Sequence, residues 1–202
     1  MMPITDVRGM AEQYFAKVKA AMDAMPLHVV DTVVERLYRA YVEGRTVLVI
    51  GNGGSASTAS HMACDLSKNV FGQFPGGAAP TGRFKVLALT DNVPTITAWA
   101  NDTEYSRVFS EQVRTFVDAG DVVIAISGSG NSPNVVQAVQ LAKRMGAYTI
   151  GFLGFGGGRL GSLVDCPLVV VSAEYGPVED IHLMLNHLVT ECLKRKIASG
   201  VA

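Results

Sequence analysis

Two side chains that can transfer protons or bind metal, His61 and Asp65, are four residues apart in the sequence. In a helix this spacing places both on one face, within reach of a shared proton or a shared metal ion. An ordinary surface pair has the same spacing, so the motif alone does not establish a site. Its position favours chemistry, because the pair closely follows a glycine-rich turn at 51–55.

The last predicted helix carries three more candidates, Glu179, His182 and His187. The eight residues between Glu179 and His187 separate them by about 80° around the helix and about 12 Å along it. His182 lies about 140° from His187, so the two histidines cannot easily face one site. Helix geometry alone does not choose between them. The remaining histidine, His28, opens an earlier helix and is assigned a surface or capping role.

The glycine-rich turn joins a short apolar run at 47–50 to a helical segment. The first N–H groups of a helix lack partners within the helix and lie at the positive end of its dipole. Glycines let that backbone approach an anion closely. The turn is neither a Walker A motif nor a full G-x-G-x-x-G fingerprint. We therefore predict phosphate rather than a dinucleotide as its ligand, and a tight turn with no ligand is the alternative.

A second turn of this kind, Ser-Gly-Ser-Gly-Asn-Ser-Pro-Asn, occupies residues 127–134 and follows another apolar run. Two strand ends therefore present small hydroxyls and glycines to the start of a helix. A phosphate site built from several loops requires this arrangement.

The elements that must position these turns alternate between strands and helices. Strands are predicted at 46–50, 85–89, 121–126, 148–153 and 167–171, and helices at 4–25, 27–43, 55–68, 93–100, 104–116, 135–145 and 177–197, with a loop at 71–83 and a glycine-rich connection at 155–161. This order predicts an α/β fold with a doubly wound, five-stranded parallel sheet and an N-terminal helical extension. Ligands of such sheets bind outside the carboxyl ends of the strands. Because a small domain has little surface for both N-terminal helices, one is expected to pack against another subunit.

Length and composition narrow the class of protein. The 202 residues form one domain, and no apolar run approaches the roughly 20 residues of a membrane span. No secretory signal is evident, so we predict a cytoplasmic protein with no membrane partner. A net charge of −1, with no cation cluster longer than residues 194–196, argues against nucleic acid as a partner. Cys64, Cys166 and Cys192 lack disulfide or zinc spacing and are predicted to be small buried side chains.

Five motifs in order resemble those of the sugar isomerase (SIS) domain, and more narrowly of the phosphoheptose isomerases. They are Gly51-Asn52-Gly53-Gly54-Ser55, Thr90-Asp91-Asn92, Ala100-Asn101-Asp102, the turn at 127–134, and the segment 178–187 with its Glu and two His residues. The resemblance covers about residues 27–196. It implies a flavodoxin-like SIS domain that converts sedoheptulose 7-phosphate to D-glycero-D-manno-heptose 7-phosphate through an enediolate.

The resemblance also implies a homotetramer with active sites between subunits, in which the helices of residues 1–44 take part in assembly. Zinc would be bound by His61, Asp65, Glu179 and His187, and Asp65 with His187 would form the acid–base pair. The residues implied in substrate binding are Asn52, Gly53, Gly54, Ser55, Asp91, Asn92, Ser127, Ser129, Ser132 and Glu179. Three positions depart from the family pattern: Asp65 replaces a glutamate, Glu179 a glutamine and Gly128 a threonine.

Two other functions fit the same resemblance. One is a non-catalytic platform like the replication initiator-associating SIS proteins, which lack the second histidine of the last helix; His187 favours the enzyme. The other is a regulatory module that binds a sugar phosphate. Such a module needs the serine turns but not His61, Asp65 or His187.

Overall fold

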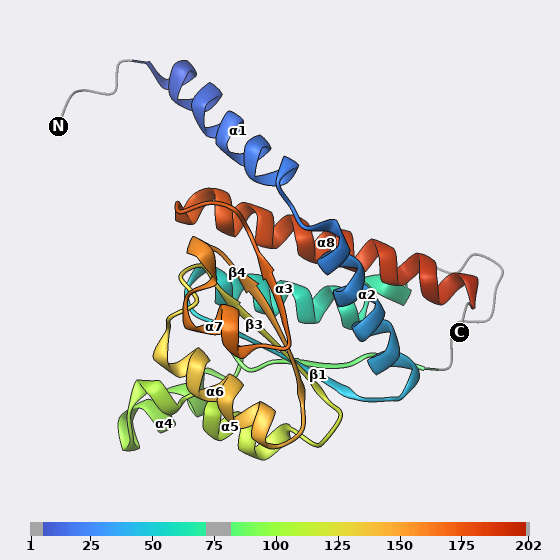
Figure 1. Ribbon diagram of the computed structural model, residues 1–202. Coiled ribbons are helices and arrows are strands. Elements are labelled where there is room, and N and C mark those ends of the chain that lie inside the picture. The colour runs from blue at the N-terminus through green and yellow to red at the C-terminus, as the bar shows by residue number, and fades with distance from the viewer. Residues whose placement is uncertain (1–5, 72–81, 201–202) are drawn as a thin grey trace.

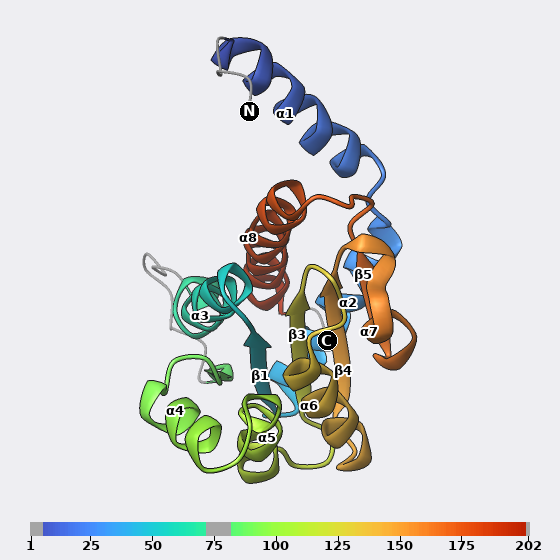
Figure 2. The same cartoon turned by 90° about the vertical axis from the view of Figure 1, so that its left-hand side faces the viewer.

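The computed structural model describes residues 6–71 and 82–200, and its centre is one parallel sheet (Figures 1 and 2). The strands are β1 (Thr46–Gly51), β2 (Lys85–Ala88), β3 (Val122–Ser127), β4 (Tyr148–Leu153) and β5 (Cys166–Val169). All four neighbouring pairs are parallel, in the order β2-β1-β3-β4-β5. This confirms the doubly wound, five-stranded sheet. Winding changes direction between β1 and β3, which are neighbours in space and carry the two serine turns.

The two central strands are buried on both faces, which explains their continuous apolar sequences. Alternate residues of β1 point to opposite sides: Val47 and Val49 pack in one core cluster, Leu48 and Ile50 in the other. The edge strand β2 instead alternates between exposed and partly buried positions. The apolar pattern of the sequence therefore reports each strand's place in the sheet.

Helices cover both faces of the sheet. On one face lie α2 (Leu27–Val42), α3 (Gly54–Ser67) and α8 (Tyr175–Ser199); on the other lie α5 (Ser110–Phe116), α6 (Pro133–Arg144) and α7 (Gly158–Leu163). Figure 2 shows α3 and α8 side by side above the sheet. Because both helices begin near the carboxyl ends of strands, they bring their first turns to the two serine loops.

The first helix, α1 (Val7–Asp23), projects from the body of the molecule (Figure 1). Among its described residues only Ala21 is buried, and large apolar side chains such as Phe15 stay exposed. Near the start of α8, the Tyr14 hydroxyl donates to Asp180 at 2.6 Å and Lys17 pairs with Glu174 at 2.8 Å. The helix is therefore attached to α8 by polar contacts and keeps most of its apolar side chains accessible.

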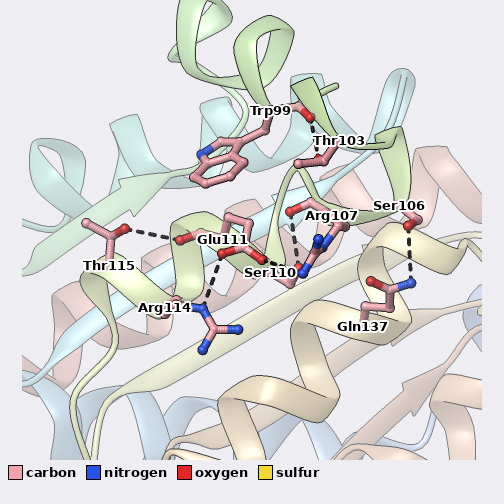
Figure 3. A network of polar contacts seen from close by, with 9 residues as sticks. All are labelled: Trp99, Thr103, Ser106, Arg107, Ser110, Glu111, Arg114, Thr115 and Gln137. Carbon is pink, nitrogen blue, oxygen red and sulfur yellow. Dashed lines mark hydrogen bonds and ion pairs between the residues drawn. The ribbon is translucent and has the colours of Figure 1, made fainter. Parts of the chain in front are cut away.

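The helix predicted at 104–116 is wrong in detail, because the chain forms α4 (Val93–Asp102), a 3-10 turn η2 (Tyr105–Arg107) and then α5. The Ser110 hydroxyl donates to the Arg107 carbonyl at 3.1 Å, a local bond that competes with a continuous helix. Figure 3 shows this bond beside the ion pairs of Glu111 with Arg107 (3.4 Å) and Arg114 (3.2 Å). A bond from Gln137 to Ser106 joins this segment to α6.

Three smaller predictions also change. The connection at 155–161 contains a 3-10 turn, η3 (Phe155–Gly157), and part of α7, while Phe71 ends the 3-10 turn η1 (Asn69–Phe71). The rest of the predicted loop, residues 72–81, lies outside the described residues. All three cysteines are free, but only Cys166 is buried; Cys192 is partly buried and Cys64 is exposed. Within the described ranges, no helix is both long and apolar enough to cross a membrane.

Candidate active site

The two serine turns form one small pocket, the serine pocket, at the point where the winding of the sheet changes direction. Its volume is about 130 Å³, and its lining comes from the turns that follow β1 and β3, from the ends of β3 and α3 at those turns, and from α8: Asn52, Ser55, Ile126, Ser127, Gly128, Ser129, Ser132, Tyr175 and Glu179. The predicted serines at 55, 127, 129 and 132 therefore lie together. The N-termini of α3 and α6 meet at the same pocket, because Gly53 and Ser132 are their N-cap residues.

The serine hydroxyls are oriented by the backbone of their own turn. Ser127 accepts a hydrogen bond from the Gly130 N–H, and Ser129 accepts one from the Asn131 N–H, both at 3.2 Å. Since these bonds use oxygen lone pairs, each hydroxyl proton can donate to a ligand. No lysine or arginine occurs among the described lining residues. An anion here would be bound by hydroxyls, backbone N–H groups and helix dipoles.

Asn52 joins the two turns through its side-chain amide. It donates to Asn134 at 2.9 Å and accepts from Asn134 at 2.8 Å, while the Tyr105 hydroxyl donates to the Asn52 carbonyl oxygen at 3.0 Å. Asn134 is buried. Asn52 therefore lines the pocket and also fixes the distance between the turns. The sequence reasoning missed the role of Asn134, because the pairing partners are 82 residues apart.

Gly54 allows α8 to approach the first turn closely. A β-carbon at this position would lie 2.6 Å from a Glu179 carboxylate oxygen, so a larger residue here would force the end of that side chain to move. At the facing turn, a β-carbon on Gly128 would lie 3.1 Å from the Tyr175 ring. Tyr175 thus occupies space beside Gly128, where the family pattern has a threonine. Tyr175 is a lining residue that the sequence did not indicate.

A second group of polar side chains, His61, Asp65 and His187, lies between α3 and α8. The His61 Nε2 atom is 3.3 Å from Asp65 Oδ2 and 3.3 Å from His187 Nε2. His187 Nε2 is 4.0 Å from the same carboxylate oxygen. Asp65 is buried, whereas both histidines are exposed at the mouth of the group. The helix spacing therefore does bring the predicted His–Asp pair to one face, where α8 completes it.

These residues suit a zinc ion by chemistry and by spacing. Two imidazoles and one carboxylate form a common catalytic zinc set, which leaves one position open. Ligand atoms about 2.1 Å from a tetrahedral ion lie roughly 3.4 Å from one another. Two of the three separations here are 3.3 Å, and the third, between His187 and Asp65, is 4.0 Å. Among the described residues, Glu179 is not part of this group. The structure therefore brings together three of the four expected ligands. The fourth, Glu179, lines the serine pocket instead.

Asp91 and Asn92 lie in a different and larger pocket of about 830 Å³, between α3, β2, α4 and α5. The Ser60 hydroxyl donates to Asp91, and the Asn92 side chain caps α4 by accepting from the Thr95 N–H at 3.1 Å. Neither residue lines the serine pocket. The larger pocket therefore lacks the serine turns, and the candidate site is assigned instead to the histidine group and the paired helix N-termini.

His182 is separated from the site, because it points into the core. It is 1% exposed, and its Nε2 atom is 3.2 Å from the Leu153 carbonyl oxygen. Burial lowers the pKa of His182 to about 4, only partly offset by the bond to Leu153. The ring is therefore neutral at pH 7. Of the two histidines on α8, only His187 lies beside His61 and Asp65.

Acid should destabilise the fold through His182. Its folded pKa of about 4 is below the unfolded value of 6.5, so the unfolded chain binds more protons between these values. This stabilisation is complete above pH 6.5 and is lost as pH falls toward 4. Between pH 7.5 and pH 5.0 the lost stabilisation amounts to about 2 kcal/mol.

Urea denaturation at both pH values tests this. The free energy of unfolding should fall less between pH 7.5 and pH 5.0 in His182→Gln than in the wild type. A His28→Gln control, at an exposed site, should keep the full loss; equal losses in all three proteins would contradict the prediction.

Comparison with known proteins identifies the family of this chain. The profile of the SIS domain matches residues 13–154. A phosphoheptose isomerase from Clostridium acetobutylicum is 36% identical over 182 residues, or 90% of this chain and 89% of that protein. The structure of phosphoheptose isomerase GmhA from Neisseria gonorrhoeae aligns with a TM-score of 0.84 at 27% identity, covering 94% of this chain and 99% of that one. A phosphoheptose isomerase from Francisella tularensis also gives 0.84, at 25% identity over 97% and 100% of the two chains. This chain therefore belongs to the SIS domain family, and its relatives there include phosphoheptose isomerases.

Proposed function

We propose that this protein is a phosphoheptose isomerase that converts sedoheptulose 7-phosphate to D-glycero-D-manno-heptose 7-phosphate. The observation that carries the proposal is that the same two helices connect the serine pocket with the His61–Asp65–His187 group. Ser55 and His61 are about 9 Å apart along α3, and Glu179 and His187 about 12 Å apart along α8. Six carbon–carbon bonds of about 1.5 Å span roughly 8 Å. A seven-carbon chain with a terminal phosphate can therefore reach both places.

The reaction moves a proton between two adjacent carbons and places negative charge on the oxygens of the enediolate. His187 is proposed as the proton carrier, because its side chain is 55% exposed and therefore accessible to a ligand. Asp65 is only 4% exposed and its oxygens are hydrogen-bonded, so we assign it chiefly to electrostatic stabilisation and metal binding. Zinc bound by His61, Asp65 and His187 would supply a Lewis acid for the substrate carbonyl. One nitrogen of His187 cannot bind zinc and carry the proton at the same time, so these two roles of His187 are alternatives. The serines are proposed to position the phosphate end. Glu179 is proposed to bind the sugar, because its carboxylate would repel phosphate but can accept hydrogen bonds from hydroxyl groups.

Proton exchange tests this proposal directly. In deuterated water the protein should incorporate deuterium at C1 of sedoheptulose 7-phosphate and form the aldose, because an enediolate exchanges its proton with the base. Sedoheptulose without phosphate serves as the control and should exchange far more slowly. Tight binding of the phosphate ester with neither exchange nor product would instead support the regulatory sugar-phosphate module. Failure to bind it would favour the platform.

The assembly is proposed to be a homotetramer built through α1 and α8. Exposed apolar side chains on α1 adjoin a groove whose lining includes Met22, Leu27, Met184 and Leu188. A second copy would cover this surface, and light scattering should then give the mass of four chains. A monomeric mass would contradict the assembly proposal without affecting the proposed chemistry. A cytoplasmic location, with no nucleic-acid partner, remains a prediction from composition.

A further inference from the structure

Asp65 is held by two asparagine side chains, one on each side of its carboxylate. The Asn186 amide donates to Oδ2 at 2.8 Å, and the Asn69 amide donates to Oδ1 at 2.5 Å. Asn186 comes from α8, immediately before His187, and Asn69 comes from the 3-10 turn after α3. A buried carboxylate is costly unless it is hydrogen-bonded. These two amides supply bonds to both of its oxygens.

The orientation of the Asn186 amide indicates that its role is to donate a hydrogen bond to Asp65. Asn186 is fully buried, and its own carbonyl oxygen has no hydrogen-bond partner among the described residues. Turning the amide over would place this oxygen against the Asp65 carboxylate, so the donor orientation is the one that the pair permits. The side chain thus leaves one buried acceptor unpaired while it donates to Asp65. A side chain needed only to fill core space would not require an amide.

The two bonds also determine where Asp65 can bind a ligand. Since Asn69 is bonded to Oδ1 and Asn186 to Oδ2, rotation of the carboxylate is restricted. The same Oδ2 atom lies 3.3 Å from His61 Nε2 and 4.0 Å from His187 Nε2. An oxygen that accepts one amide bond retains a lone pair for a metal ion. The asparagines therefore direct Oδ2 at the space between the two imidazoles.

We propose that Asn186 and Asn69 are positioning residues, which hold the short Asp65 side chain in place for a divalent metal shared with His61 and His187. Partners of this kind orient the ligands of metal sites, and their loss typically lowers metal affinity by about 10- to 100-fold. The proposal rests on the metal site proposed above. It adds that metal affinity depends on two residues that do not themselves contact the metal.

The test compares two buried positions one helical turn apart on α8. Asn186→Leu removes the donor to Asp65, whereas Thr190→Val removes a buried hydroxyl that has no partner among the described residues. Zinc dissociation constants should be measured by chelator competition on the full-length protein. We expect a 10- to 100-fold loss of affinity for Asn186→Leu and no change for Thr190→Val. Wild-type affinity in Asn186→Leu would overturn the proposal.

The exposed residue Asn69 keeps the test decisive if Asn186→Leu fails to fold. Asn69→Ala removes the second donor, and it should also weaken zinc binding; unchanged affinity in that variant would overturn the role of Asn69. If the wild type binds no zinc, the metal proposal fails separately, and steady-state kinetics then decide the positioning role. A lower kcat with unchanged KM in Asn186→Leu would support it, and an unchanged kcat would overturn it.

Discussion

Replacing His187 with alanine should lower kcat for sedoheptulose 7-phosphate by about 10²- to 10⁴-fold, the usual contribution of a general acid–base group. KM should change little, because the serine pocket that would bind the phosphate lies roughly 12 Å away along α8. The fold should be retained, since the His187 side chain is 55% exposed. Steady-state kinetics and urea denaturation measure these effects separately.

Two controls identify the origin of the loss. His28→Ala removes another exposed histidine, far from the site in sequence, and should leave kcat unchanged. Measuring kcat of His187→Ala with excess zinc distinguishes the proton-carrier role from metal binding alone. If zinc restores kcat, His187 is only a ligand and its role as proton carrier is wrong. A variant that keeps more than about a tenth of wild-type kcat without added zinc would contradict both roles.

The sheet could be predicted because each strand has a recognisable pattern in its own local sequence. β1 and β3 are continuous apolar runs that end in glycine- and serine-rich turns, a pattern that reports burial on both faces. The break before α5 was not predictable from helical spacing, because it accompanies a bond between the Ser110 hydroxyl and the Arg107 carbonyl. Periodicity describes which face a residue occupies and does not report competition of this kind.

The candidate site likewise contains residues that local sequence indicates and residues that it does not. His61, Asp65 and the serine turns have local spacing that indicates their chemistry. Asn134 and Asn186 do not, because each acquires its role from a partner on a distant element, and nothing near them in the sequence indicates it. The separation of Glu179 from the three-residue group likewise depends on how α8 lies against the first turn. The residues proposed to contact a ligand therefore have a local sequence pattern, whereas the residues that hold them do not.

The second large effect is expected at Gly130, where the serine turn contacts the chain after β4. Gly130 has φ of +65°, and a β-carbon there would lie 2.0 Å from the Gly157 carbonyl oxygen. Gly130→Ala should therefore cost about 1 kcal/mol for the left-handed backbone and about 2 kcal/mol for the overlap. Because Gly130 also donates its N–H to Ser127, the displaced turn should bind phosphate poorly. We expect a raised KM for the sugar phosphate together with a lower free energy of unfolding.

Gly156→Ala is the matched control, because it has the same kind of backbone without the overlap. Its φ is +76°, and a β-carbon there would meet no atom within 4 Å. This variant should lose only about 1 kcal/mol and keep the wild-type KM. The difference between the two variants therefore measures the contact between the serine turn and the segment after β4. If both variants change the free energy of unfolding and KM equally, the contact between Gly130 and Gly157 does not hold the turn. The Asn52–Asn134 pair would then be expected to set the shape of the serine pocket instead.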